Sequence, residues 1–115
     1  MNKDQVIHEL KDSITEMMES ARAAKGEPFG DVVAGLFELL QVSSTIGGMS
    51  EMAARGGVDL TRLASSCALA LTTTSIRMCS ILNQSDAAEA QQMAFVMLNK
   101  RNAAARMVFG AGGTA

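Results

Sequence analysis

Aromatic residues are nearly missing from this chain of 115 residues, which has four Phe and neither Trp nor Tyr. The bulk of any core must therefore come from aliphatic residues and from nine Met. Proline is also scarce, with one residue, while 48% of the chain is hydrophobic. Because Ala, Leu and Met favour helices and Pro interrupts them, this composition predicts an all-α protein. A chain of this length commonly folds as a single domain.

An excess of charge of one sign is lacking as well. The net charge is −2, so the chain has no overall basic field to attract nucleic acid. The distribution is uneven, because residues 1–31 carry seven acids and four bases, and residues 60–115 carry two acids and five bases. One interpretation is that the acidic first helix pairs with the basic last helix, within the chain or between chains. The other is an anion site in the C-terminal half.

Cysteines and long hydrophobic runs are few. Cys67 and Cys79 would stand about 18 Å apart on one helix, which is too far for a disulfide. Two lone thiols and a charged N-terminus without signal-peptide features favour a reducing, cytoplasmic location. The uncharged stretch 63–76 has 14 residues, fewer than the roughly 20 that a membrane span needs. We therefore expect no membrane span.

Apolar residues at steps of three and four predict four main helices, over about 4–25, from 28 or 31 onward, over 59–84 and over 85–109. Gly47-Gly48 would end the second helix, and a short helix over 50–55 would follow. The sequence thus predicts a small helical bundle of about four main helices plus one short helix. Its last two main helices would form a long antiparallel hairpin.

The domain boundaries follow from these elements. Residues 1–109 are expected to form a single helical domain, and residues 110–115, which are rich in Gly, a flexible C-terminal tail.

The helix expected over 59–84 has apolar or small residues at heptad spacing, the pattern of a seam against another helix. These residues are Leu60, Ala64, Cys67, Leu71, Thr74, Met78 and Ile81. The opposite face is also nearly uncharged, and a helix uncharged almost all round is buried almost all round. A domain of this size has too few other helices to cover such a helix on all sides. We therefore expect a homo-oligomer with the seam as its interface.

The same helix carries a row of hydroxyl side chains between two arginines, which could bind a small anionic ligand such as a nucleotide. The candidate ligand residues are Arg62, Ser66, Thr73, Arg77 and Ser80. The competing interpretation is that the hydroxyls bond to their own helix or fill close helix contacts. A guanidinium in such surroundings needs an acidic partner, so Arg77 is expected to pair with Asp86, Glu89 or an acid of a neighbouring chain.

Catalytic and metal-binding patterns are weak. His8 is the only histidine, and with Asp12 it fits a solvated helix face. The pair Glu16 and Glu19 lacks the second acidic pair that a helical Mg²⁺ enzyme would need. Cys67 lies on the apolar seam, where a thiol is inert. We therefore expect no enzyme activity, no metal and no cofactor.

A helix-turn-helix-like DNA binder is a further, weak alternative. Residues 58–75 have a slight likeness to a helix-turn-helix, but Ala68 stands where the turn needs Gly, and Arg77 falls where a core residue belongs. Nucleic acid is thus an improbable partner. The sequence favours a non-enzymatic helical protein that self-associates through 59–84 and binds a partner protein, with anionic-ligand binding as the alternative.

Overall fold

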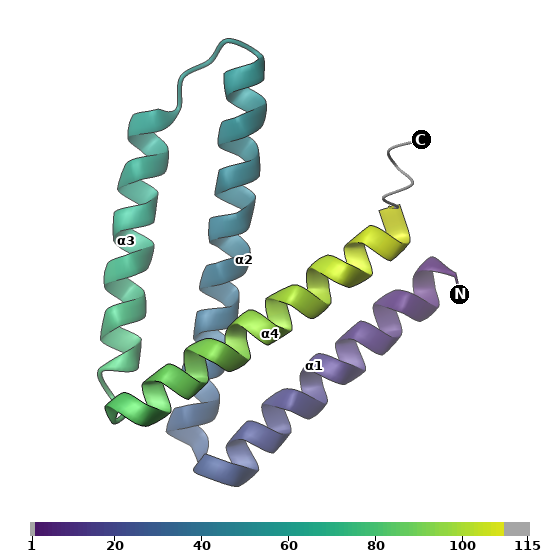
Figure 1. The fold of residues 1–115 in the computed structure, drawn as a ribbon, viewed down its shortest axis with the longest axis vertical. Coiled ribbons are helices and arrows are strands. Elements are labelled where there is room, and N and C mark those ends of the chain that lie inside the picture. The colour runs from purple at the N-terminus through teal and green to yellow at the C-terminus, as the bar shows by residue number, and fades with distance from the viewer. Residues whose placement is uncertain (1, 110–115) are drawn as a thin grey trace.

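A computed structural model describes residues 2–109, which form four helices and no strand. They are α1 (Lys3–Lys25), α2 (Glu27–Arg55), α3 (Thr61–Cys79) and α4 (Gln84–Phe109). The all-α prediction is therefore confirmed. The tail expected at 110–115 lies outside the described residues. Helices α1 and α4 run side by side in opposite directions against the first half of α2, whereas α3 returns along the second half of α2 (Figure 1).

The turn between α1 and α2 is a single glycine. Gly26 has φ of 89°, a conformation that L side chains rarely adopt, and it caps both helices. Its N–H donates to the carbonyl of Arg22 at 2.8 Å. Pro28 stands in the first turn of α2, where its missing N–H costs no helical hydrogen bond. The local sequence therefore sets the sharp reversal from α1 to α2.

The core lies where α1, α2 and α4 meet. Helix α2 contributes the large side chains, and α4 contributes a stripe of small residues that allows the two helices to approach closely. The buried residues of this cluster are Ala21, Phe29, Val32, Val33, Leu36, Phe37, Ala90, Ala94 and Met97. No residue of α3 is buried.

The predicted short helix over 50–55 is not a separate element. Helix α2 continues through Gly47-Gly48 to Arg55, so these residues are its last turns. A glycine inside a helix costs roughly 0.5–1 kcal/mol relative to Ala, which weakens a long helix without ending it. The helix ends instead at Gly56-Gly57, where Gly57 has φ of 81°.

The predicted hairpin of the last two main helices is not confirmed either. Helix α3 ends at Cys79, and α4 crosses α2 to lie beside α1 instead of running back along α3 (Figure 1). Asn83 caps α4, because its Oδ1 accepts a hydrogen bond from the N–H of Asp86 at 2.8 Å. The small residues Ala90 and Ala94 of α4 pack against the large buried side chains of α2, whereas no residue of α3 is buried.

The molecule is flat and open for its size. Its principal extents are 45 × 41 × 16 Å, and its radius of gyration is 16.3 Å. A compact domain of this length has a radius of gyration of about 13 Å. The difference comes from α3 and the second half of α2 (residues 39–55), which project beyond the core as a two-helix arm (Figure 1).

One helix within residues 2–109 is long and apolar enough to cross a membrane by length and composition, namely α2, with a mean hydropathy of 1.4 in its most apolar stretch. The expectation of no membrane span rested on residues 63–76 and took no account of α2. Helix α2 carries six buried residues, all in its first half, and 22% of its most apolar stretch is buried.

Candidate functional site

The heptad seam of α3 faces α2 of the same chain. Five of its seven residues are half-buried, and only Thr74 and Ile81 are exposed. The side chain of Met78 lies over Gly35 and fills the space where a Cβ would stand. The seam, which was expected as the interface between chains, therefore packs within one chain, and the surface left open to another chain lies on the other faces of α3.

The candidate ligand residues share an exposed stripe on the far side of α3 from α2. They are Arg62, Ser66, Thr73, Arg77 and Ser80. Arg62 and Arg77 are 15 residues apart, about 22 Å along the helix, so they do not converge on one small anion. The hydroxyl of Thr73 donates to the carbonyl of Leu69 at 2.9 Å, and that of Ser80 donates to the carbonyl of Arg77 at 2.7 Å. For these two hydroxyls, bonding to their own helix is confirmed.

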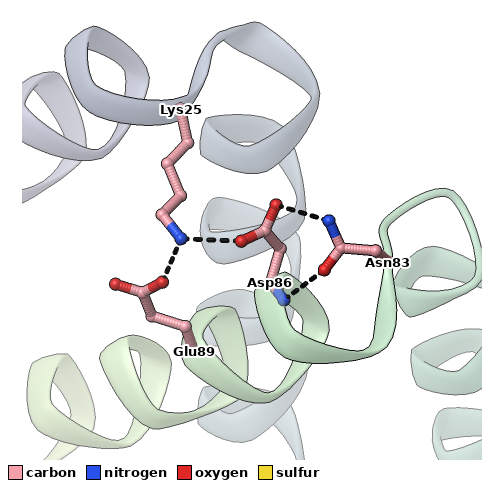
Figure 2. A network of polar contacts seen from close by, with 4 residues as sticks. All are labelled: Lys25, Asn83, Asp86 and Glu89. Carbon is pink, nitrogen blue, oxygen red and sulfur yellow. Dashed lines mark hydrogen bonds and ion pairs between the residues drawn. The ribbon is translucent and has the colours of Figure 1, made fainter.

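The acids expected to pair with Arg77 bind Lys25 of α1 instead (Figure 2). Lys25 Nζ lies 2.6 Å from Asp86 Oδ1 and also contacts Glu89. Hydrogen bonds to Asp86 and Glu89 raise the pKa of Lys25, and the hydrogen bond from Lys25 lowers the pKa of Asp86. The ion pair between α1 and α4 thus has the opposite polarity to the expected pairing.

Two cavities lie in line along one face of the arm, between α2 and α3, and are together called the groove. The outer cavity, toward the end of the arm, has a volume of about 610 Å³, and the inner cavity, next to α4, has a volume of about 300 Å³. The α3 residues of the two cavities recur every three or four positions, so both parts lie on one face of the helix. These residues are Thr61, Ala64, Ser65, Ala68, Leu71, Thr72, Ser75 and Ile76. Phe95 and Gln91 of α4 close the inner end.

The groove is lined by small, hydroxyl and aliphatic side chains, and Asp59 is the one charged residue in its lining. The Asp59 carboxylate accepts hydrogen bonds from the N–H and the hydroxyl of Thr61, which lower its pKa. Two large apolar side chains at the groove are exposed, Leu69 beside it at 69% and Ile76 in its lining at 65%. Such a surface offers van der Waals contact and hydrogen bonds to a helix.

A third cavity, of about 390 Å³, lies between α1, α2 and α4 and was not anticipated from the sequence. Lys11 and Arg101 line it together with Thr15 and Gln41. Neither cation forms an ion pair within residues 2–109. Only the antiparallel contact of α1 and α4 brings these distant positions together, so no local motif could have revealed them.

The described residues also bear on metal binding and on the helix-turn-helix interpretation. Residues 2–109 hold no group of three or more His, Cys, Asp or Glu placed to bind a metal. Helix α3 is continuous from Thr61 to Cys79, so it lacks the turn at Ala68 that a helix-turn-helix requires.

No family model matches this chain, and neither the curated proteins nor the solved structures contain a significant match to it.

Proposed function

We propose that this chain is a non-enzymatic helical interaction protein that assembles with itself through the arm. The observation that carries the proposal is that α3 has no buried residue although it is nearly uncharged. Leu63, Leu69 and Ile76 are each at least 60% exposed. Leu69 and Ile76 stand seven residues apart on the same face of α3. A contiguous apolar patch of this kind is typical of a surface that another protein covers.

The arm consists of two helices that leave much of each other's surface uncovered. Helix α3 packs mainly along α2 and meets α4 only near its C-terminal end, where the Gln91 side chain donates a hydrogen bond to Cys79 Sγ, so most of its other surface faces solvent. Covering apolar surface contributes about 25 cal/mol per Å², so a further helix on the arm would stabilise it. The same surface would serve a partner protein that presents an apolar helix.

Light scattering after size-exclusion chromatography tests this proposal on variants of the exposed apolar residues. Leu69→Glu and Ile76→Glu should convert the oligomer to a monomer while the helix content stays unchanged, because both side chains are exposed in the single chain. Met107→Glu is the matched control, since Met107 is 66% exposed at the far end of α4. A wild-type protein that is already monomeric at micromolar concentration would refute the proposal.

Binding of a small anionic ligand is the second candidate function, and the cavity at Lys11 and Arg101 favours it over the stripe of α3. Two cations without an acidic partner in the described residues, next to Thr15 and Gln41, suit a phosphate group. Inorganic phosphate or ATP should raise the melting temperature of the wild type, and Arg101→Ala should abolish that shift. The absence of any shift at millimolar ligand would exclude this function.

A further inference from the structure

We infer that the groove of the arm receives α3 of a second copy, so that two arms form an intermolecular four-helix bundle. This inference rests on the proposed self-association and specifies its geometry. Each copy would contribute α3 and the second half of α2. Four antiparallel helices around a shared apolar centre are a common and stable arrangement.

The groove extends along most of its α3 wall, so an uncharged helix of about 20 Å would span it. Its α3 wall runs from Thr61 to Ile76, about 22 Å along the helix axis. The uncharged part of α3, residues 63–76, is about 20 Å long. Among the described helices, the longest uncharged stretch is this one, because the corresponding stretch of α2, residues 39–50, has 12 residues against 14.

The distribution of charged residues among the helices also favours α3 as the helix that enters the groove. The groove is uncharged apart from Asp59 at its outer end, so an occupant that buried charges there would lose their hydration without compensation. Helix α1 carries nine Asp, Glu, Lys or Arg residues along its length, and α4 is interrupted by charge at Glu89 and Lys100. Helix α3 has charges only at Arg62 and Arg77, close to its ends.

The proposed contact gives a closed dimer, because each α3 lines the groove of its own chain and also enters the groove of the other chain. When α3 of one copy enters the groove of the other, a two-fold axis places the second α3 in the first groove. The axis would pass near Ala68, midway between Thr61 and Ile76. Small residues at this point permit close approach of the two helices, and nothing lies within 4 Å of the position where a Cβ of Gly47 would stand on α2.

Two matched pairs of substitutions on α3 test this geometry. Ala68→Arg and Ser65→Arg place a long charged side chain in the groove, whereas Ala70→Arg and Ser66→Arg place the same side chain outside its lining. All four residues are exposed in the single chain, so each variant should keep the helix content of the wild type. We expect the two groove variants to weaken self-association by at least about tenfold and the two controls to leave it within a few-fold of wild type.

The outcomes separate the inference from the proposed function. Sedimentation of a monomeric wild type would overturn both. An oligomeric wild type in which Ala68→Arg and Ser65→Arg assemble as well as their controls would overturn the groove geometry and leave self-association standing. Loss of assembly in the controls alone would place the interface on the outer stripe of α3. An assembly larger than a dimer that survives all four substitutions would likewise contradict a two-fold bundle.

Discussion

At the scale of single residues, the methionines of the described helices serve different purposes according to where each helix places them. Met97 is fully buried in the core between α2 and α4, whereas Met107, ten residues later on the same helix, is mostly exposed. The sequence pattern favoured Met as filler of a core poor in aromatics, and Met97 fits that role. The pattern alone does not separate it from Met107, because the buried stripe of α4 depends on which helix it meets.

Met97→Ala should lower the free energy of unfolding by about 2–5 kcal/mol, because the substitution removes buried contacts and leaves a cavity. Met107→Ala makes the same chemical change at an exposed site and should stay within about 0.5 kcal/mol of wild type. Urea unfolding followed by circular dichroism measures both values. Equal effects of the two substitutions would contradict the described core.

The ion pair of Lys25 with Asp86 predicts a pH dependence of stability. The folded pKa of Asp86 is lowered from 3.8, so its contribution is present above that value and is lost as the pH falls through the folded pKa. Lys25 has a raised pKa, so its contribution is present below 10.5 and is lost as the pH rises through the folded value.

Asp86→Asn should therefore destabilise the protein at neutral pH and flatten the loss of stability below pH 3.8. Glu51→Gln is the control, because Glu51 pairs with Arg55 of its own helix in an exposed position. Urea unfolding at a series of pH values gives the comparison. An acid profile of Asp86→Asn that is unchanged from wild type would argue against the pair.

At the scale of helices, periodicity predicted the elements better than their ends. The first helix was expected from about residue 4 to 25 and runs from 3 to 25, since Gly26 and Pro28 are strong local signals. Gly47-Gly48 looked like a stop, but α2 passes through it because its hydrogen bonds continue on both sides. The end of α3 at Cys79 could not be predicted, since no Gly or Pro marks it and the cap of α4 by Asn83 decides it.

Gly48→Ala should stabilise the protein by about 0.5–1 kcal/mol, because Gly48 lies inside α2 and a Cβ there meets no atom within 4 Å. Gly57→Ala should destabilise it by about 1 kcal/mol, because φ at Gly57 is 81°. Thermal unfolding of the two variants checks the opposite signs. A destabilising Gly48→Ala would show that α2 is broken at this position.

Helix α3 should show concentration-dependent protection. Because it has no buried residue in the single chain, its amides should exchange with deuterium faster at high dilution than those of the buried first turns of α2. Raising the protein concentration should slow exchange in α3 and leave residues 29–37 unchanged. Protection of α3 that is independent of concentration would contradict its burial by a second copy.

At the scale of the whole molecule, the sequence predicted the helix content and the near absence of charge from residues 59–84. It did not predict how the helices are arranged in space. The pairing of α4 with α1 and α2 depends on how the stripe Ala90, Ala94 and Met97 fits the large side chains of α2, which requires both surfaces in three dimensions. The groove likewise comes from small residues on two helices that are adjacent only after folding. The cavity at Lys11 and Arg101 also forms only when residues distant in the sequence are brought together by folding.

The open shape makes one consequence of assembly measurable. A single chain has a radius of gyration of 16.3 Å, larger than that of a compact domain of its length. Two chains joined through their arms would place the apolar groove at the centre of the particle and the two cores of α1, α2 and α4 at its ends. The proposed dimer is therefore elongated, with the two arms in the middle.

Sedimentation equilibrium of the unmodified chain over a range of micromolar concentrations decides whether the arm joins two copies. We expect a reversible equilibrium whose larger species has twice the mass of the 12.1 kDa chain. A single species of monomer mass at every concentration would contradict it, because the exposed side of α3 would then face water in the working form of the protein.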